Sequence, residues 1–248
     1  MMTTTPLRCG GVDFRNIVVL AFWITLTNFG GAAVTVPAAA AVTVWLAIGR
    51  VWRMALIWAL LFVGGALLVV TTKVLFLGWG IGIRALDFTG ISGHAMQAAA
   101  LFPTMAYLVL QDRSQRIRLG GVALALLFSA GVAASRVALA AHSVSEAVAG
   151  CVVGFAVSAA FIYLTRKLDT PKLRMLPVAL SLFALVAFLH GESVPTQRWI
   201  TDVALHLSGR EQSFRRAQWK MDGAQRLDKH VVLKTMQILP DKKTPAPR

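Results

Sequence analysis

An arginine, a histidine and a glutamate occur within twelve residues of an otherwise apolar part of the chain. The stretch at 135–146 reads SRVALAAHSVSE and contains Arg136, His142 and Glu146. His142 and Glu146 are four residues apart, so they share one face if both are helical. A glutamate in that position can orient the histidine ring and support its protonated form, which leaves the other ring nitrogen free to attack an electrophile. This pattern is typical of nucleophilic chemistry on an anionic substrate.

Helix capping accounts for part of this stretch without any chemistry. Residues 143–146, SVSE, match the S-x-x-E capping box, in which Ser143 and Glu146 satisfy free N–H groups at the start of a helix. Capping does not account for Arg136 or His142, and it is compatible with a catalytic role for the glutamate. From these residues alone, both interpretations stay open.

A second polar stretch lies directly before a long apolar run. Residues 87–94 read DFTGISGH and end in Ser92, Gly93 and His94. The free N–H groups at a helix N-terminus form an anion site, and Gly93 allows a ligand to approach the backbone closely. His94 can exchange a proton near neutral pH. The alternative is a serine N-cap beside an interfacial histidine.

The charged side chains near the two stretches favour phosphate over a metal ion. The two histidines and the glutamate could form a metal triad of two imidazoles and one carboxylate. Lys73, Arg84 and Arg136 argue against that triad, since cations repel a metal ion. Arginine binds phosphate through two parallel hydrogen bonds, and lysine binds it as a point charge. We therefore expect no metal ion and no other cofactor.

Composition and hydropathy indicate that these residues are positioned by membrane helices. Of the 248 residues, 56% are hydrophobic and 15% are charged, and the mean hydropathy is +0.65. A soluble domain of this size needs more charged side chains to cover its surface. Most of the uncharged windows reach the roughly 17 residues that a span requires. We expect an all-α, polytopic transmembrane bundle of six or seven helices, at about residues 16–29, 32–49, 54–77, 94–111, 117–135, 145–165 and 175–190.

The chain divides into four regions. Residues 1–53 hold N-terminal apolar helices, 54–165 a membrane core, 166–191 a further apolar helix, and 192–248 a polar, charged tail. The turn signal NFGG at 28–31 splits the first apolar window, and the short helix before it could be re-entrant or interfacial. The last apolar helix is short, so its full crossing is also open.

One stretch of the tail has helical periodicity. Trp199, Val203 and Leu207 are spaced at i, i+4 and i+8 within residues 198–207. This spacing predicts a short amphipathic helix, which would either lie on the membrane surface or pack on the protein. We favour packing on the protein.

The net charge of +14 is sorted by loop, which argues against nucleic acid as a partner. Nine lysines and arginines lie in the alternate loops around 50–53, 113–118 and 166–174, as the positive-inside rule expects for the cytoplasmic face. Two crossings separate the polar stretches, so both lie on the opposite side. We expect a protein of a cytoplasmic membrane with its site facing the opposite, outer side. The sequence does not indicate an oligomeric state.

The two stretches together resemble the motifs of the type 2 phosphatidic-acid phosphatase superfamily, which is related to the vanadium haloperoxidases. The family's third motif is S-R, five residues, H, three residues, D. This chain has Ser135, Arg136, His142 and Glu146 at those spacings, with glutamate for aspartate. The second motif, P-S-G-H, appears as ISGH at 91–94, without the proline.

The family's first motif, K, six residues, R-P, is incomplete. Lys73 is present, but Gly80 and Ile81 stand where the arginine and proline are expected. Arg84 is a nearby arginine at a different spacing, and whether it replaces the missing one is open. The resemblance covers about residues 54–165.

The resemblance implies a metal-independent phosphatase of a lipid phosphomonoester or diphosphate, such as undecaprenyl diphosphate, phosphatidic acid or phosphatidylglycerol phosphate. It implies that His142 forms a phosphohistidine, that Glu146 orients it, and that His94 protonates the leaving oxygen. A neutral His142 and a protonated His94 predict a bell-shaped pH profile. The phosphoryl oxygens would be held by Lys73, Arg136, Ser92 and Gly93, with Arg84 as a further candidate.

Two other functions stay open at this point. The same site could transfer phosphate to another lipid instead of to water. A catalytically degenerate protein that binds or transports lipid is the second alternative, and the missing R-P pair is its main support.

Overall fold

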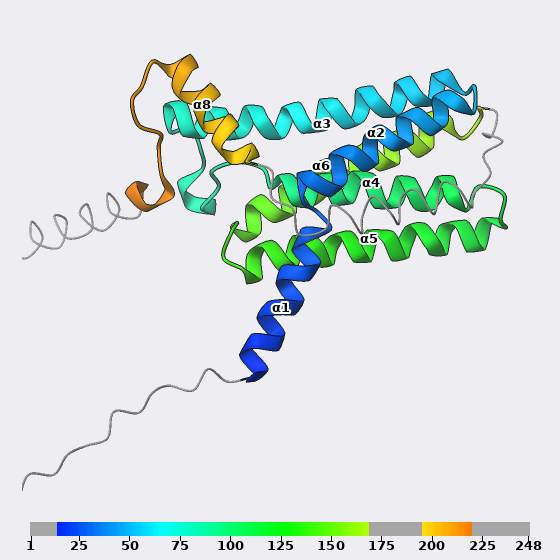
Figure 1. Cartoon of the computed structure of the whole chain (residues 1–248), viewed down its shortest axis with the longest axis horizontal. Helices are drawn as coiled ribbons and strands as arrows, with labels where there is room; N and C mark the ends of the chain where they lie inside the picture. Colours follow the sequence, from blue (N-terminus) through cyan, green and yellow to red (C-terminus); the bar gives the residue numbers. More distant parts are fainter. Residues whose placement is uncertain (1–13, 169–194, 220–248) are drawn as a thin grey trace, which may run out of the picture.

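The computed structural model describes residues 14–168 and 195–219, and these residues form an all-α bundle, as predicted. Six of the expected apolar segments are found as helices, and the predicted helix at 175–190 lies outside the described residues. A short helix of the tail is also present (Figure 1). The elements are α1 (Phe14–Asn28), α2 (Ala32–Ile48), α3 (Trp52–Trp79), the 3-10 helix η1 (Arg84–Leu86), α4 (Gly93–Val109), α5 (Gln115–Ala138), α6 (Val144–Thr165) and α8 (Thr196–Ser208).

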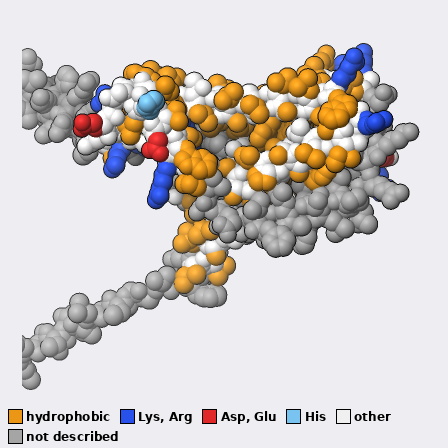
Figure 2. All heavy atoms as spheres, turned by 45° about the horizontal axis from the view of Figure 1, so that its top comes forward, with side chains coloured by type: hydrophobic (Ala, Val, Ile, Leu, Met, Phe, Trp, Pro, Cys, Tyr) orange, Lys and Arg blue, Asp and Glu red, His pale blue; other side chains and the backbone are white. Residues whose placement is uncertain are grey.

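Among the described residues, four stretches of helix are long and apolar enough to cross a membrane: Ile17–Ile48, Trp52–Trp79, Gln115–Ala138 and Val144–Thr165. Many of their leucines and valines are exposed on the outside of the bundle, including Leu60, Leu67, Leu124 and Leu127. The visible face in Figure 2 is largely hydrophobic between two ends that carry the charged side chains. The apolar outer surface, like the composition, therefore identifies the chain as a membrane protein.

Helix α4 lies at the centre of the bundle, against α2, α3, α5 and α6. Its small residues, such as Ala95 and Ala99, are completely buried. A Cβ atom at Gly150 would lie 2.6 Å from the carbonyl oxygen of Ser92, and one at Gly154 would overlap that of Met96. The Gly-x-x-x-Gly spacing of α6 thus lets its backbone touch α4. This contact sets the position of the ISGH stretch, which begins α4.

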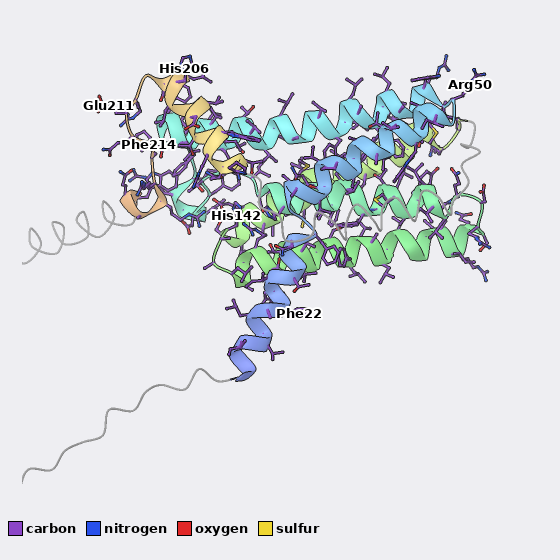
Figure 3. All side chains as sticks on the ribbon, viewed as in Figure 1. Phe22, Arg50, His142, His206, Glu211 and Phe214 are labelled. Atoms are coloured by element: carbon purple, nitrogen blue, oxygen red, sulfur yellow. The ribbon has the colours of Figure 1, made fainter. Side chains whose placement is uncertain are left out.

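The predicted break between the first two helices is confirmed. The N–H groups of Gly30 and Gly31 donate to the carbonyl oxygens of Thr27 and Asn28, at 3.0 and 3.1 Å. Helix α1 leaves the bundle at an angle to α2, and Phe22 on it is exposed (Figures 1 and 3). Its re-entrant or interfacial placement stays a prediction.

The predicted amphipathic helix of the tail is α8, and it packs on the end of α3, as we favoured. It does not pack through the face that the spacing suggests. Trp199, Val203 and Leu207 are all exposed, whereas Ala204 is completely buried. A Cβ atom at Gly78 of α3 would lie 3.2 Å from the Ala204 carbonyl oxygen, so the two helices approach too closely for large side chains.

Candidate active site

The two polar stretches meet at one cavity of about 920 Å³, which we call the His142 cavity. It lies at the end of the bundle where α3 finishes and α4 begins. Figure 3 places His142 toward the same end as His206 and Phe214, and away from Arg50. Of the predicted site residues, the cavity is lined by Lys73, Gly93, His94, Arg136 and His142. Side chains from three helices and one loop are therefore brought together as expected.

Glu146 is the most connected side chain of the site, and it is completely buried. Its Oε2 atom lies 2.7 Å from Nδ1 of His142 and accepts the backbone N–H of Ser143 at 3.2 Å. Its Oε1 atom accepts the backbone N–H of Thr89 at 2.7 Å, the Thr89 hydroxyl, and Nη2 of Arg216 at 2.6 Å. The capping box is complete, because Ser143 Oγ also accepts the N–H of Glu146. One carboxylate thus caps helix α6 and also orients the ring of His142.

This arrangement fixes which ring nitrogen of His142 carries the proton. An ionised carboxylate only accepts hydrogen bonds, so Nδ1 carries the proton and Nε2 keeps a free lone pair. Burial lowers the pKa of His142 below its usual value, and the nearby charges of Lys73 and Arg136 act in the same direction. The hydrogen bond and the charge of Glu146 oppose these effects. A lowered pKa keeps the ring neutral, which is the nucleophilic form.

His94 lies in the first turn of α4, and the turn between α1 and α2 packs against it. A Cβ atom at Gly30 would lie 2.9 Å from the His94 carbonyl oxygen. A Cβ atom at Gly31 would lie 3.8 Å from His94 Nε2. The glycine turn between α1 and α2 therefore packs directly on this histidine. From the sequence, the same turn indicated only a break between two helices.

Two cations of the cavity wall, Lys73 and Arg136, retain hydrogen-bonding capacity. Arg136 donates from Nη1 to Thr27 Oγ1 at 3.0 Å, while its Nε atom has no partner among the described residues. Lys73 Nζ lies 3.4 Å from Gln197 Oε1. Within residues 14–168 and 195–219, no acidic side chain lies at ion-pair distance from either cation. Two cations without an acidic partner, beside two histidines, are suited to binding a phosphate group.

Two candidate phosphate contacts lie outside the lining of this cavity. Ser92 is completely buried; its N–H donates to the Glu146 carbonyl oxygen at 3.1 Å, and its Oγ has no partner in the described part of the chain. Arg84 lines a separate cavity of about 480 Å³, and its guanidinium lies 5.4 Å from the ring centre of Trp219. The structure does not bring Arg84 to the His142 cavity. Contact of Ser92 with phosphate stays a prediction.

Sequence reasoning missed one wall of the cavity. Residues 195–219, which we call the 195–219 segment, contribute Gln197, Arg198, Ile200 and Arg216 to the lining. The sequence placed this segment in a charged tail outside the core. Its one signal is a pair of arginines between two aromatic residues, in FRRAQW at 214–219. That pattern is also common on solvated surfaces.

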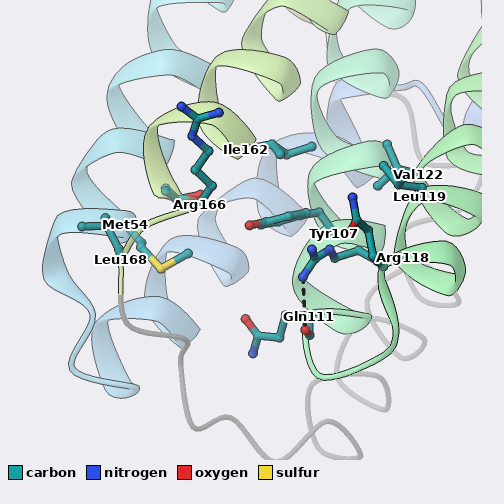
Figure 4. Close-up of a pocket in the computed structure, with 11 residues that line it drawn as sticks. Met54, Tyr107, Gln111, Arg118, Leu119, Val122, Ile162, Arg166 and Leu168 are labelled. Carbon is teal, nitrogen blue, oxygen red and sulfur yellow. Dashed lines mark hydrogen bonds between the residues drawn. The ribbon is translucent and has the colours of Figure 1, made fainter.

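A second cavity lies at the other end of the bundle (Figure 4), and we call it the Tyr107 cavity. Its volume is about 230 Å³, and none of the predicted site residues lines it. Met54 lines this cavity and Lys73 lines the other, so 19 residues of α3 separate them, which is about 28 Å. In the described ranges, no group of three His, Cys, Asp or Glu residues is arranged to hold a metal ion.

Two comparisons with known proteins find similar sequences. The model of the PAP2 superfamily matches residues 84–169, which include both polar stretches. A protein of Klebsiella pneumoniae named "Uncharacterized 22.5 kDa protein in cps region" is 34% identical over 199 residues. The match covers 78% of this chain and 95% of that protein. No solved structure matches the chain.

Proposed function

We propose, since this chain belongs to the PAP2 superfamily, that it is a membrane phosphatase that hydrolyses a phosphomonoester or diphosphate of a lipid. The proposal depends on one observation above all. A single cavity brings the ring of His142, oriented by Glu146, beside His94, Lys73 and Arg136, and no described acidic side chain pairs with either of these two cations. Phosphoryl transfer requires positioning and charge stabilisation more than any other chemistry.

The composition of the cavity wall supports a lipid as the substrate. Beyond the cations, the lining continues along α2 and α3 with Val36, Ala66, Val69 and Val70. Val36 is also exposed on the outer surface of α2, where a bilayer would lie. A phosphate headgroup at Lys73 would thus leave its acyl or prenyl chain along an apolar path. A water-soluble phosphate ester gains nothing from that path.

The first chemical step would form a covalent intermediate. Nε2 of His142 attacks phosphorus, so an N–P bond forms while the bond from phosphorus to the leaving oxygen breaks. Protonated His94 gives its proton to that oxygen, which leaves as the lipid alcohol or, from a diphosphate, as the lipid monophosphate. Glu146 supports the positive charge that develops on the ring of His142.

The second step would return the enzyme to its starting state. Neutral His94 takes a proton from a water molecule, whose oxygen attacks phosphorus. The N–P bond breaks, and its electron pair returns to Nε2 of His142, which releases inorganic phosphate. Lys73 and Arg136 stabilise the equatorial oxygens in both steps, since these oxygens carry the charge of the transition state.

We place this reaction at the outer face of the bacterial cytoplasmic membrane. The Tyr107 cavity lies at the end that carries the basic loops, and the His142 cavity lies at the other end. By the positive-inside rule, the basic end is cytoplasmic. Undecaprenyl diphosphate, phosphatidic acid and phosphatidylglycerol phosphate all fit a cationic site beside an apolar wall.

The proposal is tested by phosphate release from phosphatidic acid and from undecaprenyl diphosphate in detergent micelles, with EDTA present. Purified wild-type protein should release phosphate, and His142→Ala should not. His206→Ala is the matched control, because His206 is exposed on α8 and does not line the cavity. Equal release by wild type and His142→Ala would overturn the proposal. Phosphorylated lipid product with little free phosphate would instead show transfer to a second lipid.

A further inference from the structure

Arg216 is a cation of the His142 cavity that no motif predicts. Its Nη2 atom lies 2.6 Å from Oε1 of Glu146 and donates to Thr89 Oγ1 at 3.1 Å. Its Nη1 atom lies 3.6 Å from Asp87. The side chain is 27% exposed, whereas Glu146 is completely buried. Arg216 therefore contacts the carboxylate of Glu146 at Oε1, whereas His142 contacts it at Oε2.

The 195–219 segment is anchored on both sides of this arginine. The N–H of Phe214 donates to the carbonyl oxygen of Leu77 at 2.9 Å. On the other side, Trp219 is buried and packs edge-on against Phe76, with 4.9 Å between ring centres. Arg216 lies between these two aromatic anchors, so its position is set by contacts with the end of α3. A solvated tail would not be held in this way.

The Phe214 anchor packs against the position at which the first motif differs from the family pattern. Gly80 stands where the resemblance places an arginine, seven residues after Lys73. A Cβ atom at Gly80 would lie 3.1 Å from the ring of Phe214, and the backbone there has a φ of 71°. Glycine is favoured at this φ and leaves room for the ring. The position that lacks an arginine thus receives the segment that carries Arg216.

We propose that Arg216 is a positioning residue of the active site: it holds Glu146 through Oε1, and thereby fixes the ring of His142 through Oε2. The proposal rests on the proposed function for its kinetic consequence. A carboxylate held at one oxygen only can rotate, and its bond to Nδ1 of His142 then loses its direction. The segment that supplies Arg216 lies beyond residue 169, where the family match ends.

The positive charge of Arg216 has a separate effect on His142. The charged or titratable groups that act on the histidine are Lys73, His94, Arg136 and Glu146, and the wall of the same cavity also carries Arg198, Arg215 and Arg216. Arg216 neutralises much of the negative charge that Glu146 presents to the imidazole. Its removal leaves that charge uncompensated, and an imidazolium next to a bare carboxylate is favoured.

The kinetic test uses short-chain phosphatidic acid in mixed micelles as the probe. Arg216→Ala should lower kcat by about 10²-fold, since misplacement of a reacting group by about 1 Å has effects of that size. KM should change little, and Arg216→Lys, which restores the ion pair, should recover most of the loss. Arg53→Ala removes the same charge from an exposed site at the far end of the bundle and serves as the control.

The outcomes separate positioning from other roles. A rise in KM at unchanged kcat would overturn the proposal and assign Arg216 to phosphate binding. Equal losses in Arg216→Ala and Arg216→Lys, with lowered melting temperatures in both, would overturn it in favour of a purely structural role. Wild-type kinetics in Arg216→Ala would overturn it directly.

A second readout does not require turnover. In protein with ¹⁵N-labelled histidine, the ring nitrogens of His142 report its titration in detergent solution, and His142→Ala identifies its signal. Arg216→Ala should move this titration to higher pH, and an unchanged titration would overturn the proposal. If wild-type protein releases no phosphate but the titration moves as expected, the proposed function fails and the positioning role of Arg216 stands.

Discussion

The two ends of the bundle both carry arginines beside apolar helices, but the surroundings of these arginines differ. At the Tyr107 cavity, Arg118 lies over the ring of Tyr107 at 5.5 Å and donates to the Gln111 carbonyl oxygen at 3.4 Å. Arg166 lies 4.1 Å from the ring centre of Tyr163. At the His142 cavity, Arg136 has one hydroxyl partner and a buried Nε atom that no described residue accepts.

This difference separates two uses of positive charge in one membrane protein. A cation that stacks on an aromatic ring at the membrane boundary is already stabilised and helps to fix the orientation of the chain. A cation that is partly buried, incompletely hydrogen-bonded and next to two histidines is stabilised only when an anion arrives. Residue type alone did not distinguish Arg118 and Arg166 from Arg136, whereas the partners of each side chain do.

The largest expected effect comes from removal of the proposed nucleophile, His142. Because a covalent intermediate cannot form without Nε2, His142→Ala should reduce kcat for phosphate release by about 10³- to 10⁶-fold. The assay of the proposed function measures this loss. A comparable loss in the control His206→Ala would show that histidine substitutions act through folding.

The same substitution at the two ends should give opposite results. Arg136→Ala should lower kcat/KM by about 10²- to 10³-fold, the usual effect of losing one donor to a developing oxyanion. Arg118→Ala should leave kcat/KM unchanged, since its partners are a ring and a carbonyl oxygen far from the site. Steady-state kinetics on both purified variants checks this prediction. Similar losses in the two variants would contradict the distinction between the ends.

Glycine substitutions sharpen the comparison at the level of packing. Gly30→Ala would place a Cβ atom 2.6 Å from Val132 Cγ1 and 2.9 Å from the His94 carbonyl oxygen, so His94 must move. We expect a loss of about 10²-fold in kcat. Gly121→Ala near the other end would meet only the tip of the Leu110 side chain, which can turn away. Gly121→Ala should therefore retain activity, and a matching loss there would remove His94 displacement as the cause.

The smallest expected effect concerns pH. The pKa of His142 is lowered, and the neutral ring is the proposed nucleophile, so the acidic limb of activity arises as the pH falls through this lowered value, while loss of the His94 proton sets the alkaline limb. The acidic limb of kcat/KM should thus lie below pH 6.5, roughly the value for a free histidine. A pH profile of wild-type kcat/KM measures it. An acidic limb above pH 7 would contradict a neutral, buried His142.

The parts of the site that sequence could predict depend on spacing along one chain segment or on the number of crossings between segments. The S-R-H-E spacing identified Arg136, His142 and Glu146, and two crossings between the polar stretches placed His94 on the same side. The helix bounds followed from the lengths of uncharged windows. These signals work because a bilayer restricts each segment to a few arrangements.

The parts that sequence missed are contacts between distant segments. Arg216 and Glu146 are 70 residues apart, and no periodicity or crossing rule connects a polar tail to a helix start. Arg84 looked like a substitute arginine by proximity along the chain, yet it lies against Trp219 in another cavity. The apolar stripe of α8 indicated a packed face, but Gly78 of α3 approaches α8 so closely that only the face with Ala204 fits against it.

The buried carboxylate of Glu146 ties stability and turnover to the same atoms. Its oxygens cap the start of the α6 helix at Ser143, hold the loop at Thr89, orient His142 and pair with Arg216. In a mutational scan that scores abundance and turnover separately, position 146 should therefore fail both measurements. Position 142, which takes part in fewer structural bonds, should fail mainly in turnover. Substitutions at position 142 would then change turnover with little change in abundance, whereas substitutions at position 146 would change both.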